Sequence, residues 1–254
     1  MMKKELLETI QKMVVRLVAV NPAGHNLCLI GGFRYRFLDS SARMSTDIDY
    51  HWSEDLDKKQ AELIALFGRR LIPEVKRRFG YNADVRAAAG PDTESPMLRV
   101  IELAFWQPEV VDSRIEIPVE ITRIICLDKM TVRTADGVVY PTPSDSDMIE
   151  SKIMAIFNRL YLEYRDIVDV FLFSNQLAPD SAQRIKIKFA KLSLDSSAIK
   201  KRRDDLITNS SYHVRGIKAV LETQLDTDTA ANIQAGGGAQ MVLDKVIEVL
   251  DRHL

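Results

Sequence analysis

Cysteine and histidine are scarce in this chain of 254 residues, which has two cysteines and four histidines. Cys28 and Cys126 each lie in an apolar run, as buried free thiols commonly do, and two thiols are too few for a disulfide framework. The histidines are scattered without the spacing of a zinc site, and His51 alone lies near other candidate residues. The composition therefore argues against a disulfide-stabilised domain and against a zinc-binding motif.

Long apolar runs are also lacking, because none reaches the roughly 20 residues that a membrane-spanning helix needs. Residues 1–20 are charged and helix-periodic, so we expect no signal peptide. Neither sign of charge dominates, since 35 basic and 36 acidic residues leave a net charge of −1. We expect a cytoplasmic protein with no membrane partner, and one that does not bind nucleic acid through its overall charge.

Two glycines follow the apolar run Leu27–Ile30, which predicts a short buried strand. A glycine lets the backbone come close to a ligand, and a helix beginning near Phe33 would direct its N–H groups at an anion. Arg34, Arg36 and Arg43 lie in the same segment and could meet the charge of a triphosphate. The pattern favours a phosphate site at Gly31 and Gly32, although such a pair is more often only a turn.

Asp47 and Asp49 flank Ile48 in a second apolar stretch. In an extended strand both carboxylates would project from one face, and Mg²⁺ prefers such hard oxygen ligands. The Asp-x-Asp pattern is weak alone, since it recurs at 55–57, 145–147 and 226–228 in polar surroundings typical of solvated surface. The order of a buried strand, Gly-Gly, a basic segment and Asp-x-Asp is what favours a nucleotidyltransferase.

A second segment carries charged residues at helical spacing. Lys152 and Arg159 are seven residues apart and fall near one helix face, and Asp166 and Asp169 also share a face. Either half alone is more typical of an amphipathic helix with surface ion pairs than of a catalytic site.

Together the segments resemble the AbiEii/AbiGii nucleotidyltransferase toxins, abortive-infection proteins of the polymerase-beta-like superfamily. That family carries Gly-Gly or Gly-Ser and then Arg-x-Ser/Thr-x-Asp-x-Asp, matched here by Gly31, Gly32, Arg43, Ser45, Asp47 and Asp49. A helix with Lys-hydrophobic-x-Ala-hydrophobic-x-x-Arg and an Arg/Lys-Asp-x-x-Asp segment follow, matched by Lys152, Ala155, Arg159, Arg165, Asp166 and Asp169.

The resemblance implies a role for each matched residue. Asp47 and Asp49 would bind Mg²⁺, with Mn²⁺ as the alternative ion. The residues implied to bind the nucleotide triphosphate are Gly31, Gly32, Arg43, Ser45 and Lys152, and Asp166 would be an essential acidic group.

A third carboxylate usually completes the metal site in this superfamily, and two glutamates are candidates. Glu116 and Glu120 would face the same side of one strand, with Pro118 between them indicating an edge strand or a bulge. We favour Glu120 and keep Glu116 as the alternative.

A basic tract lies in the C-terminal half of the chain. It could bind an RNA backbone or be a solvated helix face, and the sequence favours neither. Its members are Arg184, Lys186, Lys188, Lys191, Lys200, Lys201, Arg202 and Arg203.

The pattern along the chain predicts an α+β fold, with a mixed β-sheet nucleotidyltransferase core, flanking helices and a helical C-terminal region. Helices are expected at 3–20 and, interrupted at Pro73, at 57–79. Strands are expected between 82 and 140, with a hairpin at Asp136-Gly137, and mostly helix thereafter. The expected domains are a core over 1–140 and a helical domain over 141–254, with Ser144 or Asp145 capping its first helix.

The leading hypothesis is an Mg²⁺-dependent nucleotidyltransferase, the toxin of a type IV toxin–antitoxin pair. By resemblance it would use an NTP, modify the 3′ end of tRNA and have a cognate antitoxin. The alternatives are transfer to a small molecule or a protein side chain, and a non-catalytic nucleotide-binding module.

Overall fold

The computed structural model describes residues 3–88 and 96–254. Residues 89–95, within the region predicted to hold strands, lie outside the described residues. The chain divides into two compact units. The sheet unit comprises Met1–Ser41, Ser45–Ile124 and Met130–Pro143, and the helical unit comprises Ala42–Met44, Ile125–Lys129 and Ser144–Leu254. The expected domain boundary at residue 140 stays a prediction.

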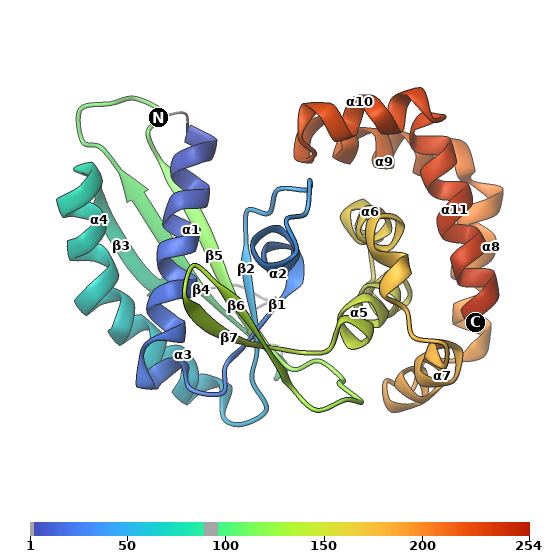
Figure 1. The fold of residues 1–254 in the computed structure, drawn as a ribbon, viewed down its shortest axis with the longest axis horizontal. Helices are drawn as coiled ribbons and strands as arrows, with labels where there is room; N and C mark the ends of the chain where they lie inside the picture. The colour runs from blue at the N-terminus through green and yellow to red at the C-terminus, as the bar shows by residue number, and fades with distance from the viewer. Residues whose placement is uncertain (1–2, 89–95) are drawn as a thin grey trace. The chain divides into compact units, whose positions relative to one another are not determined.

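A five-stranded sheet forms the centre of the sheet unit, in the order β1-β2-β5-β4-β3. The strands are β1 (Cys28–Ile30), β2 (Ile48–His51), β3 (Asn82–Ala87), β4 (Leu98–Trp106) and β5 (Ile115–Thr122). The β2 and β5 strands run parallel, and the other neighbours are antiparallel. The predicted mixed sheet is therefore confirmed (Figure 1).

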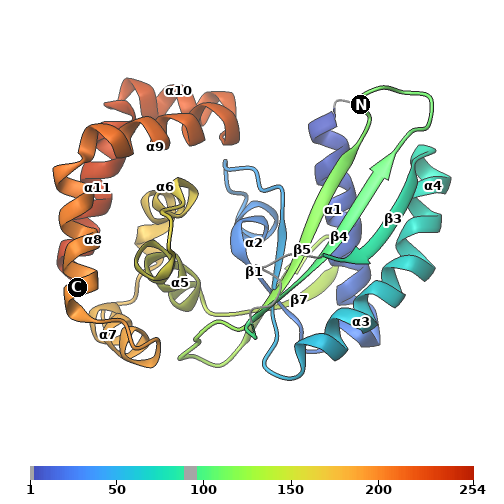
Figure 2. The same ribbon diagram turned by 180° about the vertical axis from the view of Figure 1, so that it is seen from behind.

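Helices cover one face of this sheet, namely α1 (Lys3–Ala19), α3 (Leu56–Leu66) and α4 (Ile72–Phe79) (Figures 1 and 2). Alternate strand residues such as Ile101, Val119 and Ile48 point to them and are fully buried, as the period of two requires. From α1, Ile10 and Val14 complete this core at helical spacing. The opposite face of the sheet carries the polar side chains of the candidate site.

The predicted helix is interrupted as expected, but the irregular turn lies just before Pro73. A π-helical turn, η2 (Phe67–Leu71), separates α3 from α4. Pro73 lies in the first turn of α4 and has no N–H to donate to a carbonyl of the preceding turn, which is consistent with the irregular turn just before it.

The expectation that Pro118 marks an edge strand is also wrong, because β5 lies inside the sheet. The pairing of β2 with β5 begins only at Val119. Pro118 therefore has no partner residue on β2, so its missing N–H removes no hydrogen bond to that strand. This explains why a central strand tolerates a proline there.

The predicted hairpin is confirmed as β6 (Thr131–Ala135) and β7 (Val138–Thr142). Asp136 and Gly137 connect the strands with φ angles of 49° and 72°. Positive φ at both central residues is the geometry of a type I′ turn, which asparagine, aspartate and glycine adopt most readily.

The helical unit is built from α5 (Asp145–Asn158), α6 (Tyr164–Phe173), α7 (Ser181–Lys191), α8 (Ser196–Thr208), α9 (Ser210–Gln224), α10 (Thr227–Ala235) and α11 (Gly238–His253). The Ser144 side chain caps α5 by accepting from the Asp147 N–H, as predicted. The last helix begins at Gly238. The α+β class is confirmed. Within the described residues, no helix combines the length and the apolar character needed to cross a membrane.

Candidate active site

The register of β2 against β5 brings Asp49 and Glu120 together. These residues are direct partners across the parallel pair, on the face that the covering helices leave open. Adjacent strands lie about 4.8 Å apart, so side chains at partner positions stand next to each other. Asp47 precedes β2 by one residue and is two residues from Asp49, which puts it on the same face.

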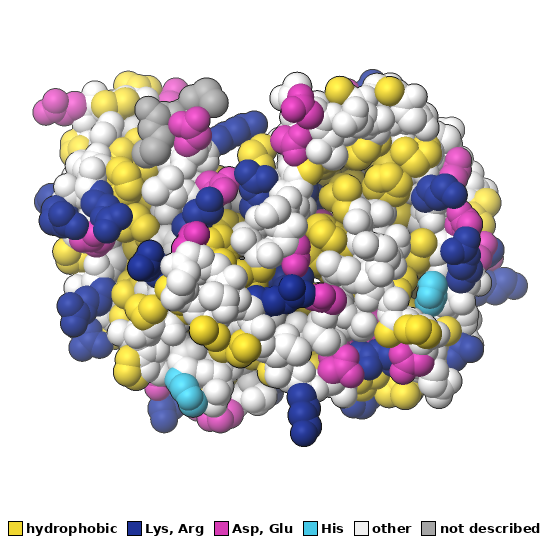
Figure 3. Space-filling view, viewed as in Figure 1, with side chains coloured by type: hydrophobic (Ala, Val, Ile, Leu, Met, Phe, Trp, Pro, Cys, Tyr) yellow, Lys and Arg dark blue, Asp and Glu magenta, His cyan; other side chains and the backbone are white. Residues whose placement is uncertain are grey.

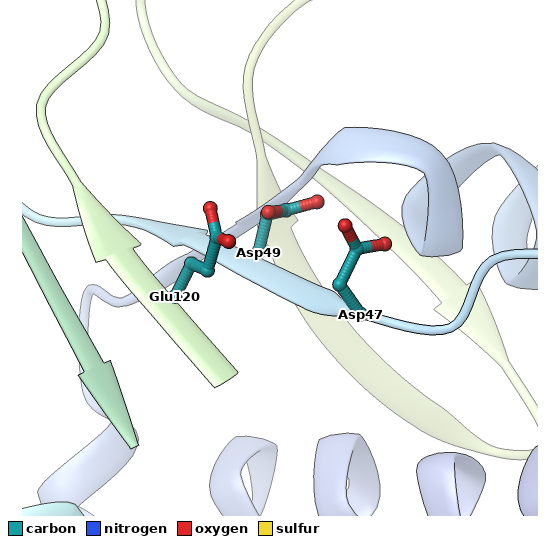
Figure 4. A group of neighbouring side chains, drawn as sticks. All are labelled: Asp47, Asp49 and Glu120. Carbon is teal, nitrogen blue, oxygen red and sulfur yellow. The ribbon is translucent and has the colours of Figure 1, made fainter. Parts of the chain in front are cut away.

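Asp47, Asp49 and Glu120 form a cluster that could hold a cation (Figure 4). One carboxylate oxygen from each lies within 4.8 Å of the other two. An octahedral Mg²⁺ holds oxygens at about 2.1 Å, so opposite ligands lie about 4.2 Å apart. Small side-chain rotations would therefore bring these oxygens to an ion, and an all-oxygen set suits Mg²⁺ or Mn²⁺.

Gly31 supports the cluster from the neighbouring strand end. It has a φ of +75° at the start of α2 (Gly31–Leu38), and a Cβ there would lie 1.7 Å from Oδ2 of Asp49. Both the backbone conformation and the closeness of the carboxylate exclude a side chain. Because α2 begins at Gly31, the helix starts two residues before the expected Phe33.

Ser45 is directed at the carboxylates in this structure. Its hydroxyl donates to Oδ1 of Asp47 at 2.5 Å, and its carbonyl accepts from the buried Gln11 amide of α1 at 3.0 Å. Asp47 is itself only 7% exposed. Ser45 thereby fixes the orientation of one candidate metal ligand.

Glu116 lies apart from the cluster, although it shares a strand face with Glu120. It is exposed, and the Arg114 guanidinium donates to it at 2.7 Å. Of the two glutamates considered from the sequence, the structure brings only Glu120 to the aspartates.

Two of the arginines expected near a triphosphate are engaged elsewhere. Arg34 is fully buried, pairs with Asp39 and donates to the Thr142 hydroxyl. Arg36 pairs with Glu8 of α1 at 3.0 Å. Both guanidinium groups pair with carboxylates of the sheet unit, which argues against the expectation that they meet a phosphate.

The residues matched in the second motif form a buried ion-pair network in the helical unit. Lys152 of α5 lies 3.0 Å from Asp166 and 3.0 Å from Asp169, both on α6. The three-residue spacing of the aspartates lets one ammonium group contact both. Arg159 lies 3.5 Å from the second oxygen of Asp166.

Arg43 belongs to this network through the short segment Ala42–Met44. Its guanidinium donates to both oxygens of Asp169, at 2.5 and 2.8 Å, and Arg43 is only 2% exposed. The Met44 N–H also donates to the Gln224 carbonyl, and Arg43 forms a β-bridge with Leu225. Arg43 thus anchors the segment that leads into Ser45 and Asp47.

Burial raises the pKa of Asp169, but the charges of Lys152 and Arg43 outweigh this effect and hold that pKa below its ordinary value. Asp169 is therefore ionised across the physiological range. The family pattern includes Asp169 but assigns it no role. The Asp-x-x-Asp spacing is the feature of the sequence that indicates a shared partner for Asp166 and Asp169.

His51 has a structural role in the sheet unit. Its Nδ1 accepts from the Ile124 N–H at 3.1 Å, and burial lowers the pKa of the imidazole. A neutral ring is what this acceptor role requires.

The basic tract does not form one surface. Lys188 is fully buried and lies 2.7 Å from Asp147 and 2.8 Å from Glu150. Arg184 pairs with both of these carboxylates and with Asp128. On the face that Figure 3 shows, lysines and arginines lie scattered among acidic and apolar side chains.

The chain resembles known proteins in sequence and in fold. The family model of the AbiEii nucleotidyltransferase toxin, of type IV toxin–antitoxin systems, matches residues 14–235. The fold resembles JHP933 from Helicobacter pylori at 16% identity and a TM-score of 0.57, covering 98% of this chain and 95% of that one. It also resembles MenT4, a nucleotidyltransferase toxin from Mycobacterium tuberculosis, at 18% identity and a TM-score of 0.52, covering 98% and 93%.

No curated protein sequence matches the chain. The structural likenesses, at these identities, establish the fold alone. The family model spans most of the chain, and the chain therefore belongs to the AbiEii nucleotidyltransferase toxins, so that its enzyme class is nucleotidyltransferase.

Proposed function

We propose that this toxin transfers a nucleoside monophosphate from an NTP to the 3′-terminal hydroxyl of tRNA, in a reaction that depends on Mg²⁺. The observation that carries the proposal is the cluster of Asp47, Asp49 and Glu120, whose ligand oxygens lie within 4.8 Å of one another. Three carboxylates at this separation repel unless a cation lies between them. Family membership supports the reaction class.

In the proposed reaction, the acceptor oxygen bonds to the α-phosphorus and loses its proton to solvent. The bond from that phosphorus to the oxygen bridging to the β-phosphate breaks, and pyrophosphate leaves. A bound Mg²⁺ supplies positive charge against the charge that develops on the phosphate oxygens. Asp47, Asp49 and Glu120 hold the ion, and Ser45 keeps Asp47 oriented.

Of the remaining predicted residues, Gly31, Gly32 and Lys152 bind the nucleotide in this proposal. Gly31 and Gly32 form the start of α2, whose free N–H groups can donate to a phosphate. Lys152 contacts the triphosphate, and Asp166 holds the ammonium group in place from 3.0 Å. Arg43 binds no phosphate directly, since Asp169 occupies its guanidinium, and it acts as a positioning residue.

The proposal also includes a cognate antitoxin and a cytoplasmic location. Type IV toxin–antitoxin membership supports the first. NTP and tRNA are both cytoplasmic, which supports the second.

A transfer assay with labelled NTPs, Mg²⁺ and total RNA tests the proposal. The variants Asp47→Asn, Asp49→Asn and Glu120→Gln keep the side-chain shape and remove a ligand charge. Each should lower label transfer by at least about 100-fold, because metal charge stabilisation is worth several kcal/mol at about 1.4 kcal/mol per factor of ten. Glu116→Gln on the same strand is the matched control and should keep the activity.

The identity of the labelled product separates the alternatives. Label in tRNA supports the proposed acceptor, whereas label in protein or in a small soluble product would replace it. NTP binding without pyrophosphate release would indicate a non-catalytic module. Full activity of the Asp49→Asn variant, or activity undiminished by chelation of divalent ions, would refute the metal site.

A further inference from the structure

A cavity of about 500 Å³ lies in the helical unit, and none of its lining residues belongs to the candidate active site. Its walls come from the end of α7, the first half of α8 and Leu254, which follows α11. The apolar side chains that line it are Phe189, Ala190, Leu194, Ile199 and Leu254. A volume of roughly 300–1,000 Å³ with a mostly apolar lining is typical of small-molecule sites.

The α7 wall of the cavity is anchored in the core of the helical unit. Phe189 is mostly buried and packs edge-on against Phe157 of α5, with ring centroids 5.6 Å apart. On the same helix, the buried Lys188 holds α7 to α5 through Asp147 and Glu150. A rigid wall of this kind lowers the entropy that a ligand loses on binding.

Three basic side chains contribute to the cavity. Lys186, Lys200 and Arg203 belong to its lining. Arg203 is balanced by Asp251, at 2.6 Å. Lys186 and Lys200, in contrast, form no ion pair with any residue in the described part of the chain. The cavity therefore combines an apolar lining with two uncompensated cations.

The polar groups available in the lining favour an aliphatic ligand over a nucleobase. Ser196 is the one uncharged polar side chain in it. A nucleobase would leave most of its hydrogen-bonding edge unsatisfied there, which costs binding energy for each buried donor or acceptor. An aliphatic chain has no such groups and gains from burial. A terminal anionic group would meet Lys186 and Lys200.

We propose that this cavity binds an amphipathic anion with an aliphatic chain, of the fatty-carboxylate class. The proposal gives a role to part of the basic tract. Arg184 and Lys188 of this tract are buried, and Lys186, Lys200 and Arg203 line the apolar cavity. RNA binding at this place is the competing outcome of the test.

Isothermal titration calorimetry of the full chain with decanoate, below its micelle concentration, measures the binding. Decanoate should bind saturably with one site per chain. Decanol, which lacks the charge, should bind about tenfold more weakly, and acetate, which lacks the chain, should show no binding. Apolar burial should appear as a negative heat-capacity change for decanoate.

Charge-reversed variants locate the site. The double variant Lys186→Glu, Lys200→Glu should weaken decanoate binding by at least about tenfold and leave decanol binding unchanged. Lys191→Glu, Lys201→Glu is the matched control, because both residues are exposed on the same two helices and neither lines the cavity. Ala190→Trp, which fills the cavity, should abolish binding of both ligands while far-UV circular dichroism stays unchanged.

Three results would overturn the proposal. The first is the absence of saturable decanoate binding. The second is that the control double variant weakens decanoate binding as much as Lys186→Glu, Lys200→Glu does. The third is that a short RNA binds, that Lys186→Glu, Lys200→Glu abolishes this RNA binding, and that decanoate does not compete with the RNA. Loss of transfer activity plays no part in this test, so the two proposals fail separately.

Discussion

At the scale of single residues, a glycine decides how closely the candidate metal ligands approach the backbone. Gly31 has a φ of +75°, and Oδ2 of Asp49 lies where its Cβ would be. Gly137 has a nearly equal φ of +72° with nothing within 4 Å of a Cβ. A side chain at either position would strain the backbone, but only a side chain at residue 31 would also collide with the candidate site. Substitutions at the two positions therefore distinguish these two effects.

Gly31→Ala should lower NMP transfer by at least about 100-fold, because Asp49 must move away from its ligand position. Gly137→Ala should keep the activity, while its left-handed backbone costs about 1–2 kcal/mol of stability. Transfer assays and urea unfolding of both variants measure the two effects. Equal activity in the two variants would contradict the role of Gly31.

Asp169 is a second residue whose environment predicts a measurable effect. Asp169→Asn should lower the unfolding free energy at pH 7 by about 3–5 kcal/mol, since it leaves the charges of Lys152 and Arg43 poorly compensated in a buried place. Chemical denaturation of the variant and the wild type measures this cost.

The pH dependence of that cost has a definite sign. The folded-state pKa of Asp169 lies below its ordinary value of 3.8. Its stabilising contribution is therefore complete above about pH 4 and is lost as the pH falls through the folded-state pKa. The difference between wild type and variant should narrow on acidification below pH 4. A difference independent of pH would contradict this assignment.

At the scale of secondary-structure elements, α7 shows how a run of basic residues divides between interior and surface. Lys186 and Lys188 are two residues apart, so they lie on different sides of the helix. Lys186 is exposed, and Lys188 is fully buried between Asp147 and Glu150. The buried ammonium group of Lys188 therefore stabilises the fold by pairing with these two carboxylates.

Lys188→Met should lower the unfolding free energy by about 3–5 kcal/mol, because it leaves two buried carboxylates short of a partner. Lys186→Met, the control on the same helix, should change it by no more than about 0.5 kcal/mol. Urea denaturation compares the two. If Lys188→Met instead weakened RNA binding and left stability unchanged, the structural role would be wrong.

At the scale of the whole chain, each compact unit has its own hydrophobic core. One core contains Ile10, Phe67 and Val119, and the other contains Ile153, Val168 and Leu243. The residues of each core belong to one unit only. Local stability is therefore expected to differ between the units.

Leu243→Ala should destabilise the helical unit by about 2–5 kcal/mol, since Leu243 is fully buried. Native-state hydrogen exchange should accelerate in α9 and α11 and change little in β4 and β5. Uniform acceleration across both units would show that they unfold as one.

The sequence by itself determined the local elements and the residue types of the candidate site. Apolar periodicity, Asp136-Gly137 and the Ser144 cap are short-range signals, and the helices, the hairpin and the Gly-Gly and Asp-x-Asp motifs followed from them. The order of the motifs along the chain also led to the family.

Tertiary structure alone decided which of these residues meet. The parallel pairing of β2 with β5 selects Glu120 over Glu116, and it joins strands far apart in the sequence, which no local pattern encodes. Burial decided that Arg34, Arg43 and Lys188 pair with carboxylates inside the protein. A charged side chain looks the same in a sequence whether it faces solvent or a buried partner, because the distinction arises only from long-range packing.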